Sequence, residues 1–122
     1  MKMKLPESEL EIMLVLWQHD QPIRTSQVME EINQNWTQST VKALLTRLTE
    51  KGFVELTREG RFTLYRALVK EEDYRKSETR GLLRRYYKNS VKSMVAALVN
   101  EENLTGEDLK ELQEIIQNAG RD

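Results

Sequence analysis

The side chains best suited to chemistry in this chain of 122 residues are hydroxyl and cationic ones, gathered in one short segment. Hydroxyl, ammonium and guanidinium groups donate hydrogen bonds to phosphates and to base edges, and an alanine methyl contacts the methyl group of thymine. The segment between residues 37 and 47 holds such side chains at Thr37, Ser39, Thr40, Lys42, Ala43, Thr46 and Arg47. They predict non-covalent recognition of double-stranded nucleic acid.

Catalytic and metal-binding residue types are scarce. The chain has no cysteine, and His19 is the sole histidine, so thiolate zinc sites, cysteine nucleophiles and two-histidine metal sites within one chain are excluded. No glycine-rich phosphate loop is found among the five glycines. We interpret His19, beside Asp20, as a structural cap at the end of a helix. We expect no enzymatic activity, no cofactor and no metal site.

Charge is segregated along the chain although the formal net charge is only -1. Residues 1–35 carry 3 positive and 6 negative side chains, residues 36–92 carry 14 and 7, and residues 93–122 carry 2 and 7. A basic middle between acidic ends favours a nucleic-acid surface confined to one region.

Membrane insertion is not expected. The longest apolar run, from Ile12 to Trp17, is far shorter than the roughly 18 residues of a membrane-spanning helix. The first residues lack the apolar stretch of a signal peptide, and the absence of cysteine suits a reducing compartment. We expect a cytoplasmic protein.

Three helices and a hairpin are predicted to position the hydroxyl and cationic segment. Apolar spacing predicts a first helix over 8–18 with a Ser8–Glu11 capping box, and Thr25 is expected to cap a second helix after a short bridging strand. A third helix is expected from the Thr37 cap to the Gly52 stop. Its inward stripe is Val41, Leu44, Leu45 and Leu48.

Two β-rich runs, 53–57 and 62–69, follow around a Glu59–Gly60 turn. Three helices followed by a hairpin with basic residues at its tip are typical of the winged helix-turn-helix, in which the third helix enters the major groove. Arg58 and Arg61 at the tip are candidates for phosphate or minor-groove contacts. The fold class is therefore mainly α with a small β-hairpin, and residues 1–69 form the expected DNA-binding domain.

Residues 70–122 are expected to form a helical dimerisation domain. Their helices carry more apolar surface than a winged helix needs, and identical chains are the commonest partners of such surfaces. We expect a homodimer. The candidate dimerisation residues are Tyr74, Leu82, Tyr86, Val91, Met94, Val95, Leu98, Val99, Leu109, Leu112 and Ile116.

Motifs spread over nearly the whole chain resemble those of the penicillinase-repressor (BlaI/MecI) family, to which CopY-type repressors are related. They are the Leu5–Pro6–x–Ser8–Glu9–x–Glu11–Ile12–Met13 opening, Leu16–Trp17, Trp36–Thr37, the run from Thr40 to Leu48, Lys51–Gly52–Phe53, Tyr65 and Leu104–Thr105. The resemblance implies a cytoplasmic homodimeric repressor that binds a palindromic operator. It also implies control of β-lactam resistance or stress-response genes.

Departures from the family pattern fall at residues of functional interest. Ala43 stands where the family often has threonine, and the cysteine motif of CopY-type proteins is missing. In penicillin-responsive members a membrane sensor-protease cuts between an Asn and a Phe, and the matching positions here are Ala97 and Leu98. The resemblance thus implies a sensor-protease partner and places a candidate regulatory cleavage region at this pair.

One alternative of a different class remains open at this point. Winged helices also serve as protein-assembly modules that do not bind DNA. An assembly surface on the third helix would tend to be apolar, whereas Ser39, Lys42 and Arg47 make it polar and basic.

Overall fold

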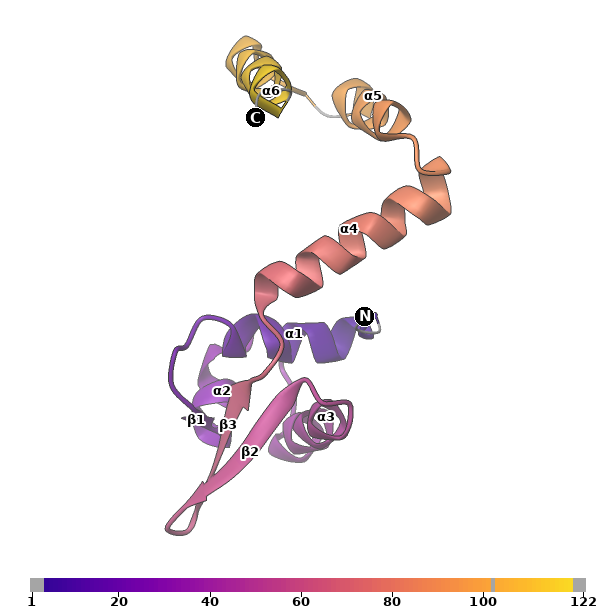
Figure 1. The fold of residues 1–122 in the computed structure, drawn as a ribbon. Helices are drawn as coiled ribbons and strands as arrows, with labels where there is room; N and C mark the ends of the chain where they lie inside the picture. Colours follow the sequence, from indigo (N-terminus) through magenta and orange to yellow (C-terminus); the bar gives the residue numbers. More distant parts are fainter. Residues whose placement is uncertain (1–3, 102, 120–122) are drawn as a thin grey trace. The chain divides into compact units, whose positions relative to one another are not determined.

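The computed structural model describes residues 4–101 and 103–119, which form two compact units that divide between Glu78 and Thr79 (Figure 1). The chain order is α1 (Glu7–Leu16), β1 (Ile23–Arg24), α2 (Thr25–Glu31), α3 (Gln38–Glu50), β2 (Val54–Glu59), β3 (Phe62–Ala67), α4 (Glu71–Tyr87), α5 (Val91–Glu101) and α6 (Gly106–Ala119). The predicted class, mainly α with a small hairpin in a winged helix-turn-helix, is confirmed.

The sheet of the first unit is antiparallel, with strand order β1-β3-β2. Arg24 pairs with Leu64 and Val54 with Ala67, and the ladder closes at Glu59–Phe62. Gly60 and Arg61 are therefore the two turn residues, one position later than the predicted Glu59–Gly60 turn. Gly60 has φ +63°, a left-handed conformation that glycine adopts without steric cost.

A single apolar core holds the first unit together. The inward stripe predicted for the third helix is buried as expected, at Val41, Leu44, Leu45 and Leu48. It packs with α1, α2, β2 and β3, and the fully buried members with the largest side chains are Phe53, Ile12, Met13 and Leu16. This burial fixes which face of α3 is turned outward.

Tyr74 belongs to this core rather than to a surface that a partner could cover. Its side chain is 5% exposed, its ring packs against Trp17 and Phe53, and its hydroxyl accepts a hydrogen bond from the Leu5 amide at 2.9 Å. Burial raises the pKa of the Tyr74 phenol. Tyr74 was predicted among the dimerisation residues, and its burial in the first unit argues for a core role instead.

A domain boundary between residues 69 and 70 stays a prediction.

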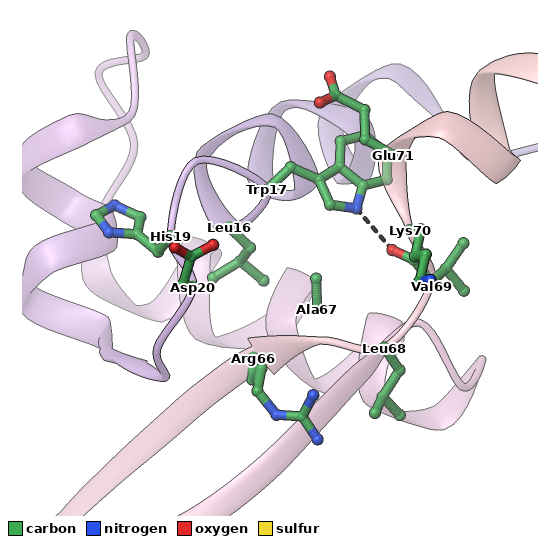
Figure 2. Close-up of a pocket in the computed structure, with 10 residues that line it drawn as sticks. All are labelled: Leu16, Trp17, His19, Asp20, Arg66, Ala67, Leu68, Val69, Lys70 and Glu71. Carbon is green, nitrogen blue, oxygen red and sulfur yellow. Dashed lines mark hydrogen bonds between the residues drawn. The ribbon is translucent and has the colours of Figure 1, made fainter.

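Trp17 joins the end of α1 to the segment that follows β3. Its indole Nε1 donates a hydrogen bond of 2.7 Å to the Val69 carbonyl oxygen, as Figure 2 shows. The two residues line a hollow of about 290 Å³ with His19, Arg66 and Glu71. This hydrogen bond holds the segment that follows β3 against the end of α1.

Two predicted helix caps, at Ser8–Glu11 and at Thr25, are wrong. Pro6 is the N-cap of α1 without a side-chain bond, so the Ser8–Glu11 capping box does not form. Arg24, held extended in β1, is the N-cap of α2, so Thr25 is already the first helical residue. Thr105 and Asp108 exchange bonds of 3.0 Å at the start of α6, which is a reciprocal capping box.

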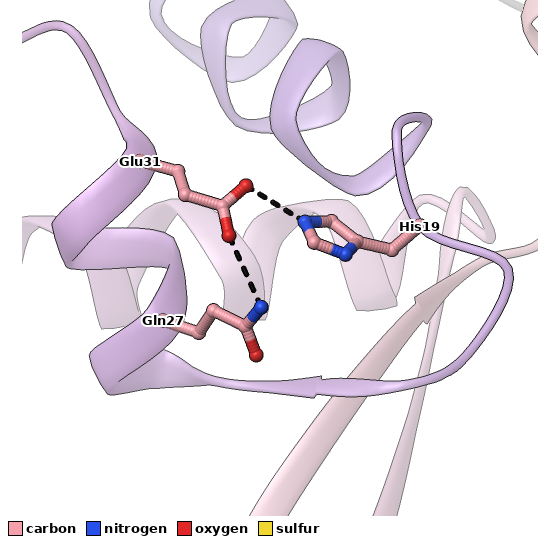
Figure 3. A network of polar contacts seen from close by, with 3 residues as sticks. All are labelled: His19, Gln27 and Glu31. Atoms are coloured by element: carbon pink, nitrogen blue, oxygen red, sulfur yellow. Dashed lines mark hydrogen bonds and ion pairs between the residues drawn. The ribbon is translucent and has the colours of Figure 1, made fainter.

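His19 has a structural contact that differs from the predicted cap. Glu31 accepts hydrogen bonds from His19 Nε2 at 2.7 Å and from Gln27 Nε2 at 3.1 Å (Figure 3). The imidazole thus links the turn after α1 to the last turn of α2. These bonds lower the pKa of the Glu31 carboxyl, the His19 bond more than the Gln27 bond.

Candidate nucleic-acid interface

The outer face of α3 carries every residue that the sequence singled out on this helix. Thr37 caps the helix as predicted, and its Oγ1 accepts a hydrogen bond of 3.2 Å from the Thr40 amide. The stripe from Val41 to Leu48 anchors the opposite face in the core. All seven predicted contacts on this segment are exposed: Thr37, Ser39, Thr40, Lys42, Ala43, Thr46 and Arg47.

Three hydroxyl groups cluster at the first turn of α3. Thr37 Oγ1 lies 3.0 Å from Thr40 Oγ1 and 3.2 Å from Ser39 Oγ. Hydroxyl hydrogens rotate to suit an incoming acceptor, so this cluster presents donors on the solvent side without breaking the helix cap. Such a turn suits contacts to phosphate oxygens or base edges.

The wing extends beyond the helices of the first unit, and its tip is the turn at Gly60 and Arg61 (Figure 1). Arg58 lies opposite Thr63 in the ladder, and Arg58 and Arg61 are both exposed. Side chains alternate across a strand, so Arg58 shares a sheet face with Val54, whose side chain is buried in the core. The Glu59 carboxylate is on the other face.

A hollow of about 330 Å³ brings the wing and α3 together. Lys42 and Arg61, which are far apart in the sequence, both line it. The hollow also contains Arg24, Ser26 and Gln38, which sequence reasoning did not select. No local pattern marks Arg24 and Ser26, because their position depends on the pairing of the two-residue strand β1 with β3.

Ion pairing divides the cations of the first unit into two groups. Lys51 binds Glu9, Arg66 binds Glu55, and Arg75 and Lys76 pair with acids one turn earlier in α4. Within the part of the chain that the structure describes, no acidic side chain lies at ion-pair distance from Arg24, Lys42, Arg47, Arg58 or Arg61. The cations on α3 and the wing therefore have no acidic partner among the described residues, so they are available to bind the phosphates of a nucleic acid.

The apolar stripes of the second unit are largely exposed. Val91 and Leu98 of α5 and Ile116 of α6 are more than half exposed, and Leu82, Tyr86, Val95 and Leu109 are also exposed. Met94, Val99 and Leu112 are half-buried. A hollow of about 600 Å³ lies between α5 and Ile116 and is lined mainly by apolar side chains. Ala97 and Leu98, the predicted cleavage region, lie inside α5.

In residues 4–101 and 103–119, no cluster of three or more histidine, cysteine, aspartate or glutamate side chains has the arrangement of a metal site. No helix there is long and apolar enough to span a membrane.

Proteins with similar sequences include a penicillinase repressor and a methicillin resistance regulatory protein. The chain is 32% identical over 116 residues to the penicillinase repressor of Bacillus licheniformis, covering 93% of this chain and 90% of that protein. It is 27% identical over 115 residues to the methicillin resistance regulatory protein MecI of Staphylococcus aureus (strain N315), covering 93% of both chains.

Two solved structures of BlaI match 61% of the chain. The DNA-binding domain of the repressor BlaI matches with a TM-score of 0.53 and 35% identity, covering 61% of this chain and 94% of that one. Monomeric Bacillus licheniformis BlaI in complex with the blaP half-operator matches with a TM-score of 0.51 and the same identity and coverage. The penicillinase repressor family itself matches residues 5–118. The chain therefore belongs to the penicillinase repressor family.

Proposed function

We propose that this protein is a non-enzymatic, homodimeric transcriptional repressor that binds a palindromic DNA operator in the cytoplasm. The observation that carries the proposal is the α3 and wing surface, whose exposed cations lack acidic partners in the described part of the chain. The half-operator bound by the similar repressor BlaI supports the same use of this surface.

Within this surface, α3 reads sequence and the wing adds affinity. A rigid helix backed by the core places Thr46 and Arg47 at fixed positions in a major groove, where side-chain donors distinguish base pairs. Arg58 and Arg61 are on an exposed hairpin tip and hold phosphates. Charge reversal at both arginines is expected to weaken binding to every duplex equally.

The second unit supplies dimerisation. The exposed apolar stripes of α5 and α6 are suited to pairing with the same stripes of a second copy. Two joined copies place two recognition helices on two half-sites, which explains why the proposed operator is palindromic. Cutting at Ala97–Leu98 by a membrane sensor-protease would release DNA by separating the copies, and this route stays a prediction.

The regulated genes are proposed from relatives alone. A penicillinase repressor and a methicillin resistance regulatory protein are both similar over 93% of this chain. Control of β-lactam resistance genes is therefore the first hypothesis to test.

Selection from a library of genomic fragments at two salt concentrations tests the proposal. We expect enrichment of a palindromic sequence, with affinity that falls steeply as salt rises because bound counterions are released. Recovery of no enriched palindrome would refute sequence-specific binding and favour the assembly module. Lys70→Ala is a suitable control variant, since Lys70 is exposed but lies outside α3 and the wing.

A further inference from the structure

The hollow between α3 and the wing contains only cationic, polar and aromatic side chains among the described residues. Arg24, Lys42 and Arg61 supply three positive charges, and Ser26, Gln38 and Thr63 supply hydrogen-bond donors. No carboxylate lines it. A site with this composition favours a fully ionised group that has acceptor oxygens only, such as a phosphate, over a base edge, which mixes donors and acceptors.

Arg24 is held in this hollow by an aromatic side chain. Its guanidinium carbon lies 3.7 Å from the centre of the Phe62 ring, a cation–π contact. Strand pairing explains the approach: Arg24 is opposite Leu64, so Phe62 is its diagonal neighbour on the same sheet face. A cation–π contact engages no N–H hydrogen bond, and no described carboxylate pairs with Arg24, so its N–H groups are left for a ligand.

We propose that this hollow binds one backbone phosphate of the operator, with Arg24 as its main donor and Phe62 as the residue that positions Arg24. Lys42 and Arg61 flank the same phosphate and connect it to α3 and to the wing tip. The inference rests on the proposed function, because it assigns one contact of the same DNA surface. It adds a contact residue, Arg24, that neither the sequence motifs nor the third helix indicated.

The first test replaces Arg24 in the full-length protein and measures binding to the operator recovered by selection. We expect Arg24→Ala to weaken binding by about threefold to thirtyfold. The slope of log affinity against log salt should fall by about 1, and sequence preference should stay unchanged. Arg24→Lys should keep the slope but recover only part of the affinity, because lysine lacks the planar fork.

Arg66→Ala is the matched control, since it removes the same charge from the same sheet. Arg66 is paired with Glu55 and lines the hollow at the other end of β3. Its loss should leave the salt slope unchanged. Thermal denaturation of each variant checks that the pairing of β1 with β3 survives the substitution.

A double-mutant cycle tests the role of Phe62. Phe62→Leu should weaken binding in the wild type but have no effect in the Arg24→Ala background, and Phe62→Tyr should retain binding because it keeps the ring. A neutral methylphosphonate at the contacted position should weaken the wild type more than it weakens Arg24→Ala, because only Lys42 and Arg61 still face that phosphate in the variant. Independent effects of the Arg24 and Phe62 substitutions would overturn the positioning role.

The outcomes separate this inference from the proposed function. If the wild type binds no operator, the proposed function fails first. A second outcome is that the wild type binds the operator and Lys42→Ala binds it more weakly, but Arg24→Ala and Arg66→Ala have the same operator affinity and salt slope. In that case only the proposed phosphate site is wrong. Titration with inorganic phosphate adds a further outcome: binding that Arg24→Ala abolishes, with operator affinity intact, would assign the hollow to a small phosphate ligand and overturn the duplex contact.

Discussion

Lys42 and Arg47 differ in their surroundings although both project from the exposed face of α3. Lys42 lines the hollow beside the wing together with Arg24 and Arg61, whereas Arg47 is one of the two cations of α3 and lies outside this lining. A lysine ammonium acts as a point charge, and an arginine fork bonds two acceptors of guanine at once. Similar charge on one helix therefore does not imply a similar role.

We predict that Arg47→Ala costs about 1–3 kcal/mol of operator affinity and relaxes preference at one base position. Lys42→Ala should weaken all duplexes equally and reduce the salt slope by about 1. Competition binding with single-base operator variants at two salt concentrations measures both effects. The reverse assignment, with preference lost in Lys42→Ala only, would contradict the prediction.

Glu31 gives the first unit an acid-sensitive contact. Its pKa is lowered by the hydrogen bonds from His19 and Gln27, so these bonds stabilise the folded state above the usual glutamate pKa of 4.5. Their contribution is lost as pH falls through the lowered pKa of the folded state. Glu31→Gln should therefore be less stable than the wild type near neutral pH, and the difference should shrink as the pH falls below the usual glutamate pKa of 4.5.

Urea denaturation at several pH values checks this prediction. The matched control is Glu30→Gln, because Glu30 is the exposed neighbour of Glu31 and makes no ion pair with any residue that the structure describes. A constant gap between Glu31→Gln and the wild type as the pH falls below 4.5 would argue against the contact.

Gly60 in the wing and Gly81 in α4 are expected to respond in opposite directions to replacement by alanine. Gly60 turns the wing at φ +63°, whereas Gly81 lies inside α4, and a Cβ added at either position would meet no atom within 4 Å. Space is thus equal at the two positions, and backbone conformation alone distinguishes them.

Gly60→Ala is expected to destabilise the protein by about 1–2 kcal/mol because an L side chain is strained at this left-handed turn. Gly81→Ala is expected to stabilise it by about 0.5–1 kcal/mol because alanine is the better helix former. Chemical denaturation measures both changes. Equal destabilisation by the two substitutions would show that α4 is not a regular helix at Gly81.

At the scale of the whole molecule, we propose that the first unit recognises DNA and that the second unit joins two copies of the chain. The first unit has one buried core, and the exposed cations of its α3 and wing have no acidic partner among the described residues. The helices α5 and α6 have no buried residue in their described parts, so their apolar side chains are available to a second copy in the proposed dimer. Linking two DNA-binding units raises affinity because the second contact becomes intramolecular.

Leu98→Asp is predicted to give a monomer that binds the operator about 10²- to 10⁴-fold more weakly than the wild type. The side chain is 52% exposed on α5, so the charge is tolerated in a single copy and disrupts only an apolar contact between copies. Sedimentation and operator titration measure the two effects. A monomeric wild type at micromolar concentration, or full operator affinity in the variant, would refute the dimer mechanism.

The sequence alone determined the element types and the exposed face of α3, because helical periodicity, the Thr37 cap and the Gly52 stop are local signals. Tertiary structure decided what local signals do not encode. Pairing of β1 with β3 places Arg24 against Phe62, and it makes Thr25 the first residue of α2 rather than its cap. Packing against Trp17 and Phe53 buries Tyr74 in the core of the first unit. These outcomes depend on contacts between residues distant in the chain, and periodicity within one segment carries no information about them.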